Sequence, residues 1–315
     1  MADVIKKATR DSYGAALVEL AEVYPDLVVL DADLAAATKT GGFKKAYPDR
    51  FFDCGIAEGN MMGIAAGLAA AGKKVFASSF AMFAAGRAFE QVRNSIGYPH
   101  LNVKIGATHA GISVGEDGAT HQCCEDIALM RTIPGMTILN PADDTEAKQA
   151  VRAALELDGP VYLRFGRLPV PVLFGDDYRF EIGKAVEMTE GGDVAIIATG
   201  LLVGEALAAA ETLKNEGIRA RVINMATIKP IDRDCIVRAA KETGAIVTAE
   251  EHNIIGGLGG AVAEVVCETV PVPVLRGGVN DTFGKSGPAL ELLNLYGLNA
   301  AHIVEAAKEA IRRKA

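Results

Sequence analysis

Short apolar runs alternate along the first half of the chain with segments whose apolar residues recur at helical spacing. Continuous apolar runs separated by helices are typical of strands buried on both faces of a parallel sheet. Residues 3–24 carry an apolar stripe that predicts an amphipathic helix. The pattern then predicts strands near 27–31, 51–55, 75–79, 102–107, 137–140 and 161–165, and helices near 58–71, 83–97, 122–132 and 143–157.

Prolines and glycines interrupt this alternation over residues 166–192. A second series follows them. It has strands near 194–199, 219–223, 245–249 and 272–275, and helices near 201–216, 232–243, 258–268 and 301–313. The predicted fold class is therefore α/β, with two doubly wound, mostly parallel-sheet domains. We expect a larger domain at 1–170, a linker at 171–190 and a smaller domain at 191–315.

Composition agrees with that fold and narrows the possible partners. Half of the 315 residues are hydrophobic, yet aromatics make up only 6% and Trp is absent, so the cores depend on small aliphatic side chains. The net charge of −8 and the lack of a basic stripe argue against nucleic acid. The apolar runs are too short to span a membrane, and the first twenty residues contain no signal-peptide pattern.

The five cysteines predict neither a disulfide framework nor a zinc site, because their number is odd and no CxxC occurs. A cytoplasmic location fits best with reduced cysteines. No GxSxG motif supports a serine hydrolase. The glycine-rich stretch 256–260 lacks the lysine of a phosphate-binding loop and follows two glutamates, so we interpret it as a tight turn that opens a closely packed helix.

Several chemically versatile residues stand where predicted strands end. Parallel sheets bind ligands at the carboxyl ends of their strands, so these side chains are expected to converge on one rim. They are Asp33, Glu58, Phe80, His109 and Arg167.

Glu58 lies at a strand-to-helix junction among small apolar residues. One interpretation is a first-turn acid favoured by the helix dipole, which contributes roughly 0.3–1 kcal/mol. The other is a functional carboxylate. Phe80 and Phe83 are similarly open to two interpretations, as core residues or as a stacking platform for a planar heterocycle. Arg10 and Arg167 are either solvated surface charges or phosphate clamps.

The loop 109–121 gathers His109, Asp117 and His121 around three glycines. A metal site, a structural turn with surface histidines, and a polar wall for a hydroxylated, charged substrate are all compatible with it. The third is favoured, because imidazoles donate hydrogen bonds and transfer protons while a carboxylate accepts from hydroxyls.

Six stretches together resemble thiamine-diphosphate enzymes of the transketolase type, in particular the C-terminal subunit of a split transketolase with its pyrimidine-binding and C-terminal domains. The resemblance covers essentially the whole chain. The stretches are FFDCGIAEGNMMGIAAGLA, SSFAMFAAGRAFEQVR, ATHAGISVGEDGATHQ, TILNPAD, ATIKPID and VTAEEHNIIGGLGGAVAE.

The resemblance implies a thiamine-diphosphate site. Glu58 matches the catalytic glutamate that hydrogen-bonds N1′ of the cofactor's aminopyrimidine. Phe83 matches the ring that stacks on this aminopyrimidine, with Phe80 beside it. Asp33 and Leu34 match positions that line the cofactor cleft.

It also implies a sugar-phosphate site. His109 matches a catalytic residue that contacts the substrate, and His121 matches a catalytic residue that takes part in hydroxyl binding and proton transfer. Asp117 matches a substrate-binding residue that contacts a sugar hydroxyl. Arg10 and Arg167 match phosphate-binding arginines. The implied reaction moves a two-carbon ketol unit from a ketose phosphate to an aldose phosphate.

Three departures from the family pattern shape the expected assembly. No Gly-Asp-Gly followed at the family's spacing by Asn-Asn occurs, so a separate N-terminal subunit is expected to hold the diphosphate and Mg²⁺, within a heterotetramer of two copies of each chain. This chain is expected to hold no metal itself. Residues 35–37 offer no hydroxyl where full-length enzymes often have serine, and Gly59 replaces a bulkier residue.

Three other functions stay open from the sequence. Two are enzymes with the same domain pair: a 1-deoxy-xylulose-5-phosphate synthase-like enzyme and the beta subunit of a 2-oxo acid dehydrogenase. The GEDGxTH pattern of the 109–121 loop favours transketolase over both. The third is a non-catalytic subunit that has kept the fold, against which the intact Glu58, Phe83, His109, Asp117 and His121 argue.

Overall fold

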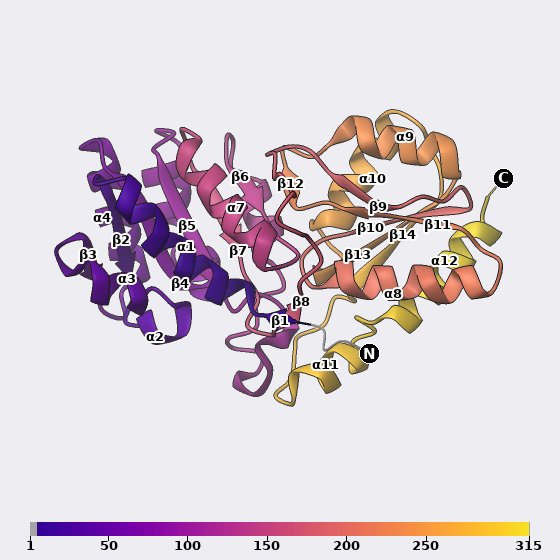
Figure 1. Cartoon of the computed structure of the whole chain (residues 1–315), viewed down its shortest axis with the longest axis horizontal. Coiled ribbons are helices and arrows are strands. Elements are labelled where there is room, and N and C mark those ends of the chain that lie inside the picture. Colours follow the sequence, from indigo (N-terminus) through magenta and orange to yellow (C-terminus); the bar gives the residue numbers. More distant parts are fainter. Residues whose placement is uncertain (1–4, 315) are drawn as a thin grey trace.

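The computed structural model describes residues 5–314 as two open sheets that lie side by side along the long axis of the molecule (Figure 1). Each sheet has helices on both faces, and most strand pairs are parallel. The predicted α/β fold class with mostly parallel sheets is confirmed.

The first sheet has the strand order β12-β6-β7-β5-β4-β2-β3 within the described residues. All neighbouring pairs in it are parallel except β12 with β6. The strands are β2 (Leu27–Asp31), β3 (Phe51–Asp53), β4 (Lys74–Phe80), β5 (Val103–Thr108), β6 (Thr137–Leu139), β7 (Val161–Arg164) and β12 (Thr227–Lys229).

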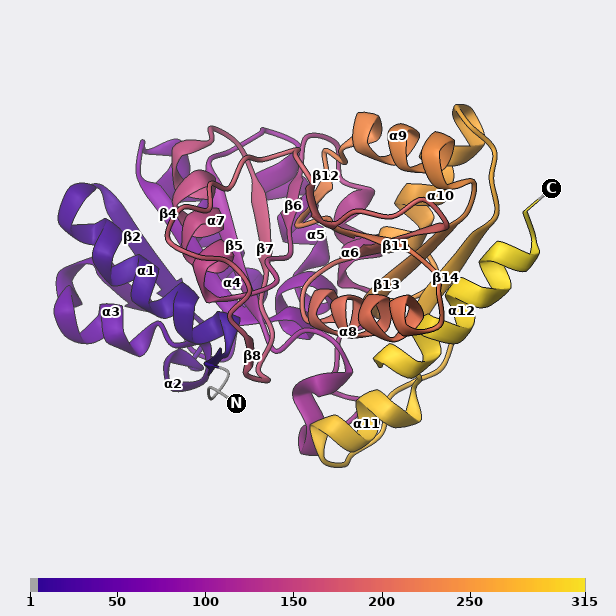
Figure 2. The same ribbon diagram turned by 45° about the vertical axis from the view of Figure 1, so that its right-hand side comes forward.

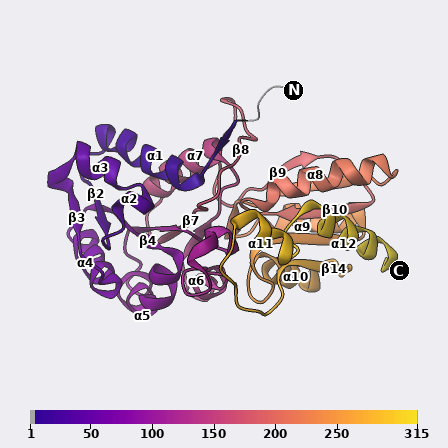
Figure 3. The same ribbon diagram turned by 90° about the horizontal axis from the view of Figure 1, so that it is seen from below.

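Helices cover both faces of this sheet, as Figure 3 shows. On one face, α1 (Thr9–Val23) and α7 (Asp144–Glu156) bury side chains such as Leu17 and Val151. The opposite face is covered by α4 (Glu58–Ala70), by α6 (Asp126–Arg131) and by a helical segment made of α5 (Phe89–Gln91) between two π-helical turns, Met82–Arg87 and Val92–Gly97. The core on this face of the sheet is made largely of alanine, valine and isoleucine, the small aliphatic side chains that the composition predicted, together with methionine.

The second sheet has the order β14-β13-β10-β11-β9, with only β9 antiparallel to its neighbour. Its strands are β9 (Val186–Thr189), β10 (Val194–Ala198), β11 (Ala220–Asn224), β13 (Ile246–Asn253) and β14 (Val274–Val279). One face packs on α8 (Leu202–Asn215), α11 (Ala289–Leu295) and α12 (Ala300–Arg312), and the other on α9 (Arg233–Thr243) and α10 (Leu258–Glu268).

Several sequence predictions of local structure need correction. The first helix begins at Thr9 rather than residue 3, because Lys6–Lys7 forms strand β1 and pairs with β8 (Val170–Pro171); residues 3 and 4 lie outside the described part. The helix predicted over 122–132 spans only α6. The strand predicted at 272–275 is β14, which begins at Val274 and runs on to Val279.

Other elements had no prediction. They are α2 (Ala35–Thr38), α3 (Gly41–Ala46), the 3₁₀ turns Pro48–Arg50 and Ile112–Asp117, and β8, β9, β12 and α11. The domain division at 170 and 191 stays a prediction. β9 lies inside the predicted linker yet pairs with β11, while β12 lies beyond that linker and pairs with the first sheet.

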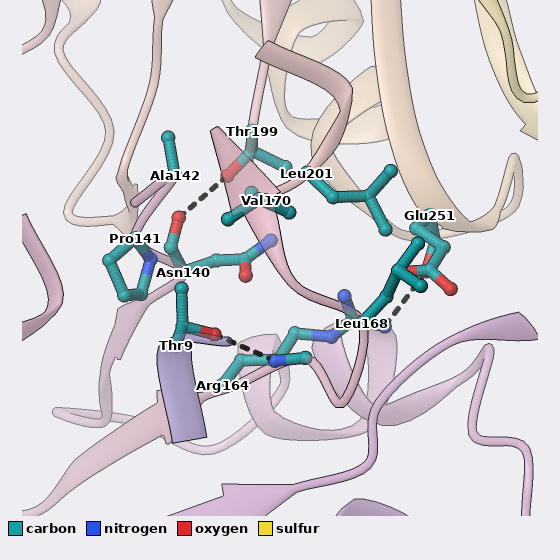
Figure 4. Close-up of a pocket in the computed structure, with 12 residues that line it drawn as sticks. Thr9, Asn140, Pro141, Ala142, Arg164, Leu168, Val170, Thr199, Leu201 and Glu251 are labelled. Atoms are coloured by element: carbon teal, nitrogen blue, oxygen red, sulfur yellow. Dashed lines mark hydrogen bonds between the residues drawn. The ribbon is translucent and has the colours of Figure 1, made fainter. Parts of the chain in front are cut away.

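The two sheets meet at a closely packed polar joint (Figure 4). The Thr199 hydroxyl donates to the Asn140 carbonyl at 3.2 Å, and Arg164 donates to the Glu251 carbonyl at 2.9 Å. The cavity between these residues holds about 20 Å³, room for one water molecule. These contacts fix the two halves of the chain against each other, and the cavity between them is too small for a substrate.

In the described part of the chain, no helix is both long and apolar enough to cross a membrane. The same residues include no group of three or more His, Cys, Asp or Glu side chains placed to hold a metal ion.

Candidate active site

The residues predicted to share one rim follow adjacent strands of the first sheet. Its order places β3, β2, β4, β5 and β7 next to one another, all parallel, so their carboxyl ends lie along one edge. Each strand delivers one predicted residue to this edge. In sheet order they are Glu58, Asp33, Phe80, His109 and Arg167.

Glu58 opens α4 and is almost fully buried, with 1% of its surface exposed. Its carboxylate is not left among apolar groups. Arg87 donates from Nη1 to both carboxylate oxygens, at 3.2 and 3.0 Å. The Arg87 side chain is 53% exposed, so the ion pair joins a buried anion to a cation at the surface.

Two phenylalanines and two histidines form an aromatic cluster beside this ion pair. The rings of Phe80 and Phe83 stack with centroids 5.8 Å apart. His109 stacks on Phe80 at 3.8 Å, and His121 meets Phe83 edge-on at 5.3 Å. The structure therefore brings together four residues that the sequence placed in one site from separate segments.

His109 is held in a single protonation state by its surroundings. Burial, followed by the charges of neighbouring Arg10 and Arg167, lowers the pKa of His109 to about 3. Its Nε2 lies 2.7 Å from Arg10 Nη1, and its Nδ1 lies 2.9 Å from the Thr108 hydroxyl. Because arginine only donates, Nε2 accepts and the proton of the neutral ring sits on Nδ1. His109 therefore presents a fixed neutral imidazole.

The predicted arginines lie at the His109 side of the rim. Besides His109, Arg10 donates to the Ala37 carbonyl at 3.2 Å. Burial lowers the pKa of Arg10, Asp11 opposes the change, and the charge of Arg167 adds to it. The charge of Arg167 therefore reaches Arg10, so the two guanidinium groups lie in the same part of the rim.

The Asp117 side chain is partly exposed and lies beside Arg167. Its carboxylate lies 3.8 Å from Arg167 Nη1, and Glu116 lies 3.5 Å from the same atom. Arg167 also donates to the Val114 carbonyl. Asp117, predicted to bind a substrate hydroxyl, and Arg167, predicted to bind phosphate, thus form an ion pair with each other.

Asp33 and Leu34 lie on a turn organised by a residue that the sequence reasoning missed. The buried carboxylate of Asp31 accepts hydrogen bonds from the Leu34 amide at 2.6 Å and from the hydroxyls of Thr38 and Thr40. Burial raises the pKa of Asp31, and these hydrogen bonds oppose that change. Asp33 takes a left-handed backbone conformation, with φ of 61°, and its amide donates to Asp53 at the end of β3. The turn is thereby fixed next to β3.

Lys39 and Arg87 are two further cations that the sequence reasoning missed. Lys39 pairs with Asp11 at 3.3 Å and adds to the field that lowers the His109 pKa. Arg87 stands four residues after Phe83, a spacing that places two side chains on one helix face, so the sequence did hold a signal for it.

The second half of the chain positions the loop that carries Asp117. The Ser113 amide donates to Glu251 on β13 at 2.5 Å, and Gln122 links the Ile112 and Lys285 carbonyls. A Cβ on Gly111 would collide with the Glu251 carboxyl group. Figure 2 shows α11 beside this loop.

The turn predicted at 256–260 leads into α10. The Glu250 carboxylate accepts hydrogen bonds from the Leu258 and Gly259 amides, so it fills the position at the start of this helix where a phosphate would otherwise bind.

Comparison with known proteins places the chain in a family. Residues 5–171 match the transketolase pyrimidine-binding domain, and residues 183–303 match the transketolase C-terminal domain. The chain belongs to the transketolase family. The resemblance to the C-terminal subunit of a split transketolase is confirmed. The chain is 51% identical over 313 residues to a protein of Methanocaldococcus jannaschii described as a transketolase C-terminal section, covering 98% of both chains.

Two further similarities bear on assembly and substrate. A solved structure described as a split gene transketolase, an inactive β4 tetramer, superposes with a TM-score of 0.92 at 56% identity, over 98% of this chain and 99% of that one. A 6-deoxy-6-sulfo-D-fructose transketolase subunit of Clostridium sp. (strain MSTE9) is 46% identical over 97% of this chain and 95% of its own length.

Proposed function

We propose that the chain is the catalytic half of a split transketolase that moves a two-carbon ketol unit between sugars carrying a terminal anion. The observation that carries this proposal is the convergence of Glu58, Phe83, His109 and Arg10 on one rim. The general reaction of the family is ketol transfer with thiamine diphosphate, and the cofactor supplies the electron sink for the transferred unit.

The residues present fit the aminopyrimidine part of that cofactor. Between Glu58 and the Phe83 ring lies the Arg87 guanidinium, which hydrogen-bonds the carboxylate and covers the ring at 4.5 Å from its centroid. A flat nitrogen-bearing group is therefore accommodated at this position. Glu58 would hold a proton at N1′ of the aminopyrimidine, Phe83 would stack on it, and Phe80 would support Phe83. Asp33 and Leu34 would line the cleft from the neighbouring turn.

At the other end of the rim, Arg10 and Arg167 would bind the terminal anion of the substrate, because guanidinium groups bind tetrahedral anions bidentately. His109 would act as a hydrogen-bonding residue instead of a titrating base, since its pKa is about 3. His121 would take the proton-transfer role, and Asp117 would bind a sugar hydroxyl once released from Arg167.

A diphosphate-binding N-terminal transketolase subunit is the partner we propose, with Mg²⁺ and the diphosphate held on that subunit and two copies of each chain in the complex. Support comes from two similarities: to a C-terminal section and to a split gene transketolase. The same relatives favour transketolase over a synthase or a 2-oxo acid dehydrogenase subunit.

The test is calorimetric titration of thiamine diphosphate with Mg²⁺ into this chain alone and into its complex with the partner. We expect binding only in the complex, and ketol transfer between sugar phosphates there. Donors with terminal phosphate and with terminal sulfonate should be compared, given the sulfosugar relative. Tight binding by the lone chain would contradict the split site. Loss of transfer in Glu58→Gln with cofactor still bound would support the assigned role.

A further inference from the structure

The Arg87 guanidinium makes two contacts at once. It donates to both oxygens of Glu58, at 3.0 and 3.2 Å, and its central carbon lies over the Phe83 ring at 4.5 Å from the centroid. Arg87 and Phe83 belong to the same π-helical turn, Met82–Arg87. Turns of this kind are rare within helices and occur frequently at functional sites.

Those two contacts are the ones that the proposed function gives to the aminopyrimidine. A guanidinium is flat, stacks on aromatic rings and donates N–H groups to carboxylates. An aminopyrimidine hydrogen-bonded to Glu58 and stacked on Phe83 would need the same volume. Two flat groups cannot both lie between one carboxylate and one ring.

We propose that Arg87 occupies the aminopyrimidine position in the cofactor-free chain and that cofactor binding requires its displacement. The inference rests on the proposed function of Glu58 and Phe83. Glu58 is 1% exposed, so the guanidinium keeps a buried carboxylate paired until the cofactor arrives. Arg87 itself is 53% exposed and can swing into solvent without losing a buried environment.

The arrangement makes Arg87 a competitor for the site. Every molecule of cofactor that binds must first break an ion pair and a cation–π contact. Arg87, the cation in both contacts, is about half exposed, so we expect the cost of breaking them to be modest, roughly a 5- to 10-fold loss of affinity.

The experiment uses the aminopyrimidine half of the cofactor alone, 4-amino-5-hydroxymethyl-2-methylpyrimidine, which needs neither diphosphate nor metal. Its dissociation constant is measured by NMR titration of the full chain for wild type, Arg87→Gln and Arg87→Lys. Arg93→Gln is the matched control, because Arg93 is an exposed arginine of the next π-helical turn whose side chain donates to Asn94.

We expect Arg87→Gln to bind the fragment about 5- to 10-fold more tightly than wild type. Arg87→Lys keeps a cation for Glu58 but loses the planar guanidinium group, so its affinity for the fragment should lie between those of wild type and Arg87→Gln. Arg93→Gln should match wild type. Raising NaCl from about 50 mM to about 500 mM should tighten binding to wild type and leave Arg87→Gln unchanged, since salt screens the ion pair.

Unchanged or weaker binding by Arg87→Gln would overturn the inference and make Arg87 a support for Glu58 in the bound state; the same holds if Arg87→Gln shows no binding at all. If Arg87→Gln does not fold, the Arg87→Lys affinity and the wild-type salt dependence decide. The double variant Glu58→Ala/Arg87→Gln separates the two proposals, because alanine cannot hydrogen-bond the fragment whereas glutamine still can. Unimpaired fragment binding by the double variant would contradict the cofactor role of Glu58, whereas loss of binding there leaves that role intact whatever Arg87 does.

Discussion

The two ends of the rim differ in how they are built. The aromatic end, Glu58, Phe80, Phe83 and Arg87, comes from two consecutive strand–helix connections of the first sheet. The cationic end, Arg10, His109, Asp117 and Arg167, joins α1, the loop after β5 and the segment after β7. That loop is held in place by Glu251 from the second sheet.

What the ends share is that their functional groups are already paired within the chain. Glu58 is paired with Arg87, Arg10 with His109, and Arg167 with Asp117. Polar groups removed from water need such partners, because an unpaired charge is costly there. The two ends differ in how deeply these pairs are buried. The anion of the aromatic end is buried, whereas Asp117 and Arg167 at the cationic end are partly exposed, so exchanging partners should be easier at the cationic end.

The largest effect is expected at the aromatic end. Glu58→Gln keeps the shape of the side chain but cannot share a proton as a carboxylate does. Ketol transfer by the assembled complex should fall by about 10² to 10⁴ in kcat. Steady-state kinetics measures this, with circular dichroism to establish the fold. Activity within a few-fold of wild type would mean that Glu58 has only a structural role and that the aromatic end does not carry the chemistry.

At the cationic end, Arg167→Met should act on substrate binding. We expect KM for a phosphorylated donor to rise by about 10- to 100-fold, because hydrogen bonds between charged groups are lost. An unphosphorylated donor should be affected far less. Glu116→Gln is the control, since it removes a neighbouring charge of Arg167 and leaves the guanidinium. Equal losses for both donors would mean that Arg167 only holds the loop.

The dependence of the cationic end on the second sheet can be measured through Glu251. Burial raises the pKa of Glu251 to about 7, above the value near 4.3 of an unfolded glutamate. Between these values the folded state holds a proton that the unfolded state has released, so stability falls as pH rises from about 4.5 to about 7.

Glu251→Gln cannot titrate. From pH 5 to pH 8, wild type should lose on the order of 2 kcal/mol more of its unfolding free energy than the variant does. Urea unfolding at both pH values gives the difference, and other buried acids cancel because both proteins contain them. Parallel pH profiles would show that Glu251 does not titrate in this range.

The smallest effect concerns the state of His109. Burial is the main cause of its low pKa, and the Arg10 charge is the next. Arg10→Met should therefore raise the His109 pKa by on the order of one unit while leaving the ring neutral at pH 7. NMR titration of the histidine ring nitrogens tests this. An unchanged pKa would mean that burial alone keeps His109 neutral.

Residues near strand ends were the part of the site that sequence reasoning could place. Glu58, Phe80 and His109 each follow an apolar run, and parallel strands deliver such residues to one edge. Lys39 could not be found this way, because it follows the short helix α2, which has no apolar periodicity, and it acts on the site only through its charge near His109. Gln122 was missed for a similar reason, since its hydrogen bond to the Lys285 carbonyl joins residues 163 positions apart.

By itself, the sequence determined the alternation of strands and helices, the two parallel sheets and the family, because these depend on local periodicity and on long motifs. Only the tertiary structure decided how the site groups are paired. These contacts join segments far apart in the chain and leave no periodic signal in the sequence. They are Arg87 with Glu58, Arg10 with His109, and Glu251 with the 109–121 loop. Each arises because a polar or charged group removed from water needs a partner, and the fold determines which partner is within reach.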